Sequence, residues 1–461
     1  MQAHSLARQE MNLYYSDGSF NQHGQNTVFR GTLSYKRSFL FVTVMAVLLS
    51  NGCAVLGLRQ DLSILDQTAE VSGKVAATHN SESPIFVALY QDKEGKQTLY
   101  AYQIAYSSGE FRFLMPPGTY YLFAFEDKNE DATFQPDEWA GWYGDPSPLT
   151  ATAGDIYRNV TLTLRAPAGA RLELPQRYPP SLTAVPMELP DGRIGTVAPL
   201  SDPRFGPKYA SRGVWEPVKF IREPGAGIFF LGPYEEGKIP ILFAHGSGGY
   251  PQQWVPIIEN LDRSRFQPWI LHYPSGLRLG MLGEFLEKYL VKLQMKYRFG
   301  RLFIVAHSMG GLISRSALNH NIENRQVPFI TLLVTISTPW QGHPTAAYGV
   351  DQSPLIVPSW YDMVPGSSFL EGLHSPPLPP GVTFALLFGF RGEETISGAL
   401  SDGGVLLSSM LDNDMQRAAS KVYGFDEDHG TILKSPAVIQ ELNRIFDKAE
   451  VDQAGRKDRS R

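Results

Sequence analysis

The stretch that decides the fold is RLFIVAHSMGGLISRSAL, residues 301–318. It begins as an apolar run typical of a buried strand and continues with the apolar spacing of a helix. Ser308 lies between the two, with Ala306 before it and Gly310 after it. Because a sharp strand-to-helix turn crowds the backbone, small residues must flank the residue at its tip. The stretch therefore predicts a turn that exposes the Ser308 hydroxyl as a nucleophile; the alternative is a serine that only caps the helix.

The same strand-and-helix pattern extends over residues 236–450. Apolar runs of strand length alternate with helical segments, and the runs read IPILFAH, QPWILHY, RLFIVAH, ITLLVTIS and VTFALLFGF. This alternation is typical of a mostly parallel sheet with helices on both faces. The sequence therefore predicts an α/β domain in this region.

Four motifs along this domain carry a family resemblance. They are FAHGSGGYPQQW at 243–254, VAHSMGG at 305–311, ISTPWQGHPTAA at 336–347 and VPGSSFLEGL at 364–373. Their order and spacing resemble the α/β-hydrolase fold, and within it the lipases and carboxylesterases. The resemblance implies a doubly wound, mostly parallel sheet and a serine hydrolase that acts on lipid or small-molecule esters and requires no cofactor.

A serine hydroxyl needs a general base, and the base needs an acid that orients it. In this fold the chain order is serine, acid, histidine. His429 is the last histidine and precedes the closing helical segment, which is where the family has its catalytic base. Asp402, in ALSDGGVLL, resembles the lipase loop that supplies the acid, and Glu393 and Glu394 are the alternatives.

The resemblance also implies an oxyanion hole made of main-chain N–H groups. Met309, directly after the nucleophile, supplies one, and Ser247, after His245 and Gly246, supplies the other, with Gly248 as the neighbouring alternative. His307 is expected to point away from the reacting groups. Three other functions stay open: an acyltransferase or a peptidase with the same three residues, and a non-catalytic surface binding protein.

The N-terminal part of the chain has a different texture. Residues 69–165 contain short alternating strands and predict an accessory β-sandwich domain, in which the segment 111–122 resembles carboxypeptidase-regulatory-like domains. Residues 166–235 are rich in proline and predict a linker that adds a strand near GIFFLGP. Residues 451–461 are expected to form a charged tail.

A lipoprotein-type signal is predicted at residues 36–53. Lys36 and Arg37 precede an apolar run at 39–49, and Cys53 follows small residues as the expected site of lipidation. Residues 1–35 then lie upstream of the true start of the protein. This interpretation predicts a protein outside the cytoplasm, either secreted or anchored to the membrane. The alternatives are an ordinary signal peptide and a buried helix.

A second, weaker pattern is the acidic stretch EDKNEDATFQPDE at 126–138. Oxygen-bearing side chains stand at the spacing of a calcium loop, at Asp127, Asn129, Asp131, Thr133 and Glu138. A structural calcium ion is one prediction and an acidic hairpin turn is the other. The net charge of −5 gives no basic surface for nucleic acid, and the single cysteine excludes an internal disulfide.

Overall fold

The computed structural model describes residues 52–459, except 78, 80–82, 94–95, 106–108, 130, 132–133, 145–146, 167–192, 325–328 and 393–398. The predicted signal up to residue 51, Thr133, Glu393 and Glu394 therefore lie outside the described residues. Cys53 falls at the second position of helix α3 (Gly52–Asp66). None of the described helices is both long and apolar enough to cross a bilayer.

The accessory domain is a sandwich of two sheets. One sheet has the order β4-β1-β8, and the other has the order β3-β2-β5-β6 with β7 paired to β5. The strands are β1 (Ala69–Ala77), β2 (Ile85–Lys93), β3 (Lys96–Ala105), β4 (Glu110–Met115), β5 (Gly118–Glu126), β6 (Ala140–Trp142), β7 (Leu149–Ala151) and β8 (Ile156–Leu164). Every second residue at the end of β8 is buried, and these side chains share one core with residues of β2 and β5. The alternating pattern in the sequence thus closes a core between two sheets, one of which is mixed because β1 pairs antiparallel with β4 and parallel with β8.

The α/β domain is built on a sheet of eight strands in the order β16-β15-β14-β13-β11-β12-β10-β9. Neighbours from β12 to β16 are parallel, whereas β10 pairs antiparallel with β12. The strands are β9 (Ile194–Val197), β10 (Gly227–Phe230), β11 (Ile239–Ala244), β12 (Phe266–His272), β13 (Leu302–His307), β14 (Ile330–Ile336), β15 (Thr383–Gly389) and β16 (Lys421–Phe425). Because the carboxyl ends of parallel strands share one edge, the loops after β11, β13, β15 and β16 meet there.

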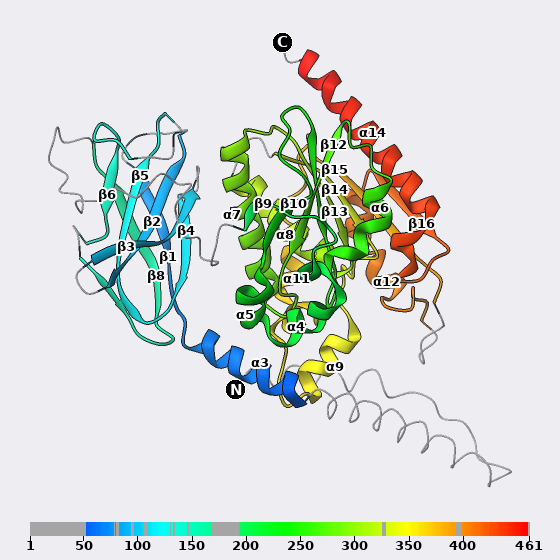
Figure 1. The fold of residues 1–461 in the computed structure, drawn as a ribbon, viewed down its shortest axis with the longest axis horizontal. Coiled ribbons are helices and arrows are strands. Elements are labelled where there is room, and N and C mark those ends of the chain that lie inside the picture. Colours follow the sequence, from blue (N-terminus) through cyan, green and yellow to red (C-terminus); the bar gives the residue numbers. More distant parts are fainter. Residues whose placement is uncertain are drawn as a thin grey trace, which may run out of the picture. The chain divides into compact units, whose positions relative to one another are not determined.

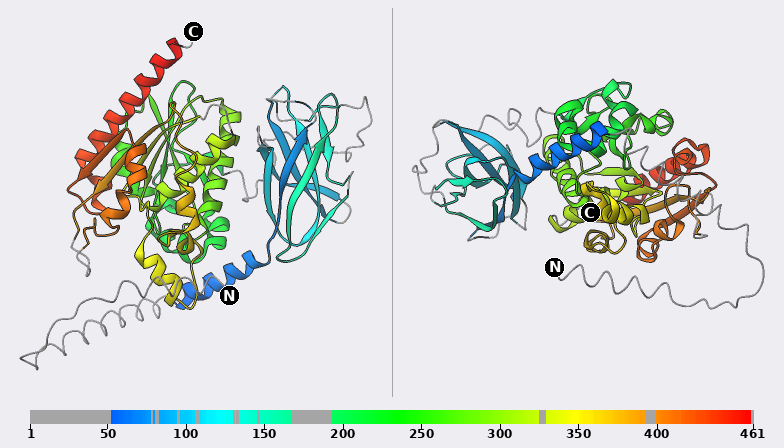
Figure 2. Two further views of the ribbon diagram at one scale, coloured as in Figure 1. Left: turned by 180° about the vertical axis from the view of Figure 1, so that it is seen from behind. Right: turned by 90° about the horizontal axis from the view of Figure 1, so that it is seen from below.

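Helices cover both faces of this sheet (Figure 1). On β13, Ile304 and Ala306 pack into the core beneath α7 (Leu279–Tyr297) and α8 (Met309–Asn324), while Phe303 and Val305 pack into the core beneath α6 (Val255–Glu259) and α14 (Pro436–Arg459). A strand buried on both faces must be apolar throughout, which explains the continuous apolar runs in the sequence. Figure 2 shows the same layers from two further directions.

Short helices fill the connections of the α/β domain. The α-helices are α4 (Ala210–Trp215), α5 (Pro217–Phe220), α9 (Pro344–Gln352), α10 (Pro358–Met363), α11 (Ser368–Gly372), α12 (Leu407–Met410) and α13 (Asn413–Ala418). Single turns of other helix types are η2 (Pro203–Phe205), η3 (Pro207–Tyr209), η4 (Ile221–Gly225), η5 (Pro251–Trp254) and η6 (Thr431–Lys434).

Two boundaries differ from those expected from the sequence. The eight-stranded sheet includes β9 and β10, so the α/β domain starts at Ile194 rather than at residue 236. Both strands have only four residues. β10 confirms the strand expected near GIFFLGP, whereas proline and glycine around β9 hide its strand pattern. At the other end, α14 continues to Arg459, so the expected charged tail is the last part of a helix.

Candidate active site

Ser308 alone forms the turn between β13 and α8. The strand ends at His307, the helix begins at Met309, and Ser308 has a φ of 55°, in the left-handed region that residues with a side chain rarely adopt. The surroundings explain the small residues after it. A Cβ atom on Gly310 would lie 2.4 Å from the His245 carbonyl oxygen, which is too close for any side chain. The backbone is therefore held in a strained turn of the kind found at nucleophilic residues.

Asp402 and His429 lie together in the structure. Asp402 follows β15, His429 follows β16, and His429 Nδ1 lies 2.8 Å from Asp402 Oδ2. The main-chain N–H of His429 also donates to the Asp402 carbonyl oxygen at 2.8 Å. Asp402 Oδ1 accepts the N–H groups of Gly404 at 3.0 Å and Val405 at 2.7 Å. Each oxygen of this fully buried carboxylate thus has a donor.

These donors decide the protonation of the pair. Burial alone would raise the pKa of the Asp402 carboxyl, but the hydrogen bond and charge of His429 and the N–H groups of Val405 and Gly404 hold this pKa below its ordinary value. The carboxylate is therefore ionised at neutral pH. It can only accept a hydrogen bond, so the proton of a neutral His429 lies on Nδ1 and Nε2 is left as a base.

His429 also lies beside the turn that carries Ser308. The ring centroids of His307 and His429 are 4.6 Å apart, and His307 Nε2 lies 2.9 Å from the His429 carbonyl oxygen. The described residues contain no hydrogen bond between Ser308 Oγ and His429 Nε2; such bonds are often long in unliganded enzymes and tighten when substrate binds. The expectation that His307 points away from the reacting groups is wrong. A contact with a main-chain oxygen 122 residues away leaves no signal in the sequence.

The loop after β11 comes close to the nucleophile. A Cβ atom on Gly246 would lie 2.8 Å from Ser308 Cβ, so the loop can approach only with glycine there. The Tyr273 hydroxyl donates to the His245 carbonyl oxygen at 2.5 Å and fixes the start of the loop. Gly248 N–H is bound to Ser275 Oγ at 3.0 Å, so this alternative donor is already occupied.

The two other predicted donors have their N–H groups available. Met309 is the first residue of α8, and the first N–H groups of a helix have no partner within the helix. Among the described residues, the Ser247 N–H group has no hydrogen-bond partner, and Ser247 itself is exposed. Ser247 follows Gly246, which lies close to Ser308, and Met309 directly follows Ser308. Both residues are therefore suitable donors to an oxyanion.

Buried neutral histidines surround the site. Burial lowers the pKa of His245 to about 4, and burial together with the nearby His429 lowers the pKa of His307 to about 3. Both rings are therefore uncharged at neutral pH. His429 is then the histidine of this group that is placed to gain a proton during a reaction.

The acidic turn predicted to bind calcium is only partly described. Asp127 Oδ1 accepts the N–H of Asp131, and the two oxygens of Glu138 accept the N–H groups of Lys128 and Gln135. Burial, with the charges of Asp127 and Asp131, raises the pKa of Glu138. These carboxylates stabilise the turn itself, and within the described residues they form no three-ligand group. Calcium binding stays a prediction.

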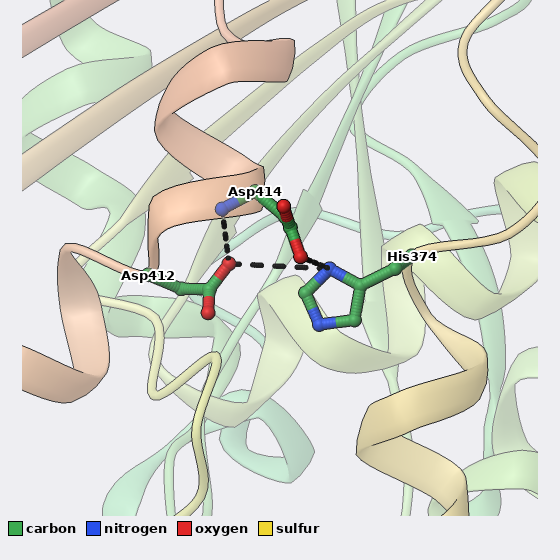
Figure 3. Close-up of side chains that lie close together, drawn as sticks. All are labelled: His374, Asp412 and Asp414. Carbon is green, nitrogen blue, oxygen red and sulfur yellow. Dashed lines mark hydrogen bonds and ion pairs between the residues drawn. The ribbon is translucent and has the colours of Figure 1, made fainter.

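In the described part of the chain, three side chains that could bind a metal ion lie close together: His374, Asp412 and Asp414 (Figure 3). His374 Nδ1 lies 3.9 Å from Asp412 Oδ1 and 3.8 Å from Asp414 Oδ2. Asp412, however, caps α13: its Oδ1 accepts two main-chain N–H groups, and its Oδ2 accepts Gln341 Nε2 at 3.1 Å. Because these lone pairs are already used, the group is a helix cap with a neighbouring histidine rather than a prepared metal site.

Comparison with known proteins gives a family match and several similar solved structures. A family model described as "Alpha/beta hydrolase of unknown function (DUF915)" matches residues 282–355, which include Ser308. A gene product of Listeria innocua is similar at 19% identity and a TM-score of 0.35, over 44% of this chain and 92% of that protein. The mature form of a Bacillus licheniformis lipase is similar at 18% identity and a TM-score of 0.36, over 45% of this chain and 92% of the lipase. No curated protein matches the chain. The strand order, the turn at Ser308 and the family match together identify the fold as that of the α/β-hydrolases.

Proposed function

We propose that the protein is a serine ester hydrolase, a lipase or carboxylesterase, in which Ser308 is the nucleophile, His429 the general base and Asp402 the acid that orients it. The observation that carries the proposal is the 2.8 Å contact between the buried Asp402 carboxylate and His429 Nδ1, beside the left-handed turn at Ser308. This arrangement supplies a half-buried nucleophile, a base and a buried negative charge in the order that the α/β-hydrolases use.

The reaction would proceed through an acyl-enzyme. Ser308 Oγ attacks the ester carbonyl carbon while His429 Nε2 takes the hydroxyl proton, and the Asp402 carboxylate stabilises the resulting imidazolium. The tetrahedral oxyanion accepts hydrogen bonds from the N–H groups of Met309 and Ser247. His429 then protonates the leaving alcohol. Water, deprotonated by the same imidazole, attacks the acyl-enzyme and releases the acid with Ser308 restored.

The location of the protein belongs to the same proposal. The basic and apolar residues before Cys53 favour export and lipidation at this cysteine, so that the enzyme acts on esters outside the cytoplasm while anchored to a membrane. The measurement is the mass of the mature N-terminus and the membrane fraction of the full chain, compared with a Cys53→Ser variant. A soluble, unmodified wild-type protein would contradict the anchor without touching the catalytic proposal.

The catalytic proposal is tested with p-nitrophenyl esters of increasing acyl length. Hydrolysis should occur in the wild type and vanish in Ser308→Ala, and the chain-length profile distinguishes a lipase from a short-chain esterase. Ser316→Ala is the matched control, because it makes the same substitution within helix α8, which directly follows the turn at Ser308. An added alcohol acceptor reveals acyl transfer, and a peptide substrate reveals peptidase activity. A folded protein with no serine-dependent turnover and no labelling by a fluorophosphonate would refute the proposal in favour of a binding role.

A further inference from the structure

His307 occupies an unusual place between the nucleophile and the base. It is the last residue of β13 and directly precedes Ser308 in the chain. Its side chain is buried, with Nε2 2.9 Å from the carbonyl oxygen of His429 and its ring 4.6 Å from the His429 ring. One side chain thus joins the strand that carries the nucleophile to the loop that carries the base.

The chemistry of this contact fixes the state of His307. A carbonyl oxygen only accepts hydrogen bonds, so the short contact requires a proton on His307 Nε2. Burial, followed by the proximity of His429, lowers the pKa of His307 to about 3, so the ring carries this single proton and no charge at neutral pH. A neutral ring is also what the site needs, because His429 becomes a cation during turnover and a second cation at this distance would oppose it.

The remaining hydrogen bonds of His429 all go to one residue. Asp402 accepts from the ring at Nδ1 and from the main-chain N–H, both at 2.8 Å. These two bonds hold the base to the loop after β15. Within the described residues, the bond from His307 is the one that ties His429 to β13. β13 itself is held by β11 on one side and β14 on the other, so it is a rigid support.

We propose that His307 is a positioning residue. Its ring holds the main-chain carbonyl oxygen of His429, the catalytic base, and so sets the distance between His429 Nε2 and the Ser308 hydroxyl. This inference rests on the proposed function. Because His307 and Ser308 are adjacent at the end of β13, the bond from His307 to His429 fixes the position of the base relative to the nucleophile. Proton transfer tolerates little error in this distance, and a displacement of about 1 Å lowers a rate by about 100-fold.

Two variants of similar shape separate the hydrogen bond from the packing. His307→Gln places an amide N–H near the position of Nε2, whereas His307→Met has the same length and no donor. We expect kcat of the methionine variant to fall by about 10- to 100-fold with little change in KM, and kcat of the glutamine variant to stay near that of the wild type. Thermal melting of the full chain checks that both variants fold. Equal loss in both variants, or full kcat in the methionine variant, would overturn the proposal.

A spectroscopic readout tests the same bond without using activity. In protein labelled with ¹⁵N-histidine, the proton on His429 Nδ1 that binds Asp402 gives a downfield resonance. We expect this resonance to shift or broaden in His307→Met and to persist in His307→Gln; an unchanged resonance in the methionine variant would contradict the positioning role. If instead the resonance responds to His307→Met but the wild type hydrolyses no ester, the proposed function fails and the anchoring of His429 by His307 stands. In a His429→Ala background, His307→Met should not lower the residual rate further, since the effect passes through His429.

Discussion

Replacing Asp402 with asparagine tests the state of the catalytic base. Asp402 Oδ1 accepts the N–H groups of Gly404 and Val405, whereas Oδ2 faces Nδ1 of His429 at 2.8 Å. An asparagine here will keep its carbonyl oxygen on the two main-chain donors, because the opposite orientation would place its NH₂ group against them. The NH₂ group must then face Nδ1 of His429.

The consequence for His429 can be worked out from this orientation. A donor beside Nδ1 makes that nitrogen an acceptor, so the imidazole proton moves to Nε2 and the ring presents an N–H group to Ser308. It can no longer take the serine proton. Loss of the correct tautomer in such a triad lowers kcat by about 10⁴-fold. The free energy of unfolding should fall much less, by about 2 kcal/mol for one charge-assisted hydrogen bond, since the two main-chain bonds survive.

The assay compares kcat and KM for an ester substrate between the wild type and Asp402→Asn, with Ser308→Ala as the background rate. Urea denaturation of each protein separates a catalytic effect from a loss of fold. Glu394→Gln is the control for the competing acid and should keep wild-type kcat. Near-normal turnover by Asp402→Asn, together with a collapse in Glu394→Gln, would show that the acid was assigned to the wrong residue.

Three further predictions concern the neighbours of these residues. In Gly404→Ala the new Cβ would lie 2.6 Å from Cγ of His429, so kcat should fall by about 100-fold while KM changes little, as steady-state kinetics would show. Tyr273→Phe removes the donor to the His245 carbonyl oxygen and loosens the start of the oxyanion loop; kcat should fall by about 10-fold, and reactivity with a fluorophosphonate should fall with it. Burial lowers the pKa of His307 to about 3 and that of His245 to about 4, against 6.5 when exposed, so the unfolded chain binds more protons as pH falls below 6.5. The free energy of unfolding should therefore fall by about 2 kcal/mol per histidine between pH 7 and pH 5. In His307→Gln this fall should be smaller by the contribution of one histidine, as urea denaturation at the two pH values would show.

The sequence predicted the central strands of the catalytic sheet well because they are buried on both faces. All residues of β11, β12, β13 and β14 are buried, so these strands appear as continuous apolar runs. The edge strands carry no such signal. β9 has no buried residue, and β16 alternates between exposed and partly buried positions without a single buried one. Such strands exist because a neighbour offers hydrogen bonds, and the local sequence does not contain that information.

The site divides in a similar way. The turn at Ser308 could be predicted because it imposes small residues within two positions of it. The tight loop at Asp402 could be predicted from the small residues beside it, and the structure gives the reason for one of them: a Cβ atom on Gly404 would collide with the His429 ring. The contact between His307 and His429 could not be predicted. It ends on a main-chain oxygen, which every residue has, and it exists only once the sheet has formed.

The strand order explains why His429 needs support from two directions. In the sheet, β16 is separated from β13 by β15 and β14, so the strand ends carrying His429 and Ser308 lie about 14 Å apart at about 4.8 Å per strand. His429 comes four residues after Phe425, the end of β16, and four residues span at most about 14 Å. The segment between Phe425 and His429 therefore has little length beyond the distance that it must cover as it crosses β15. Asp402 meets it at β15 and His307 meets it at β13, so loss of either contact should displace the base, and lower kcat, before it disturbs the fold.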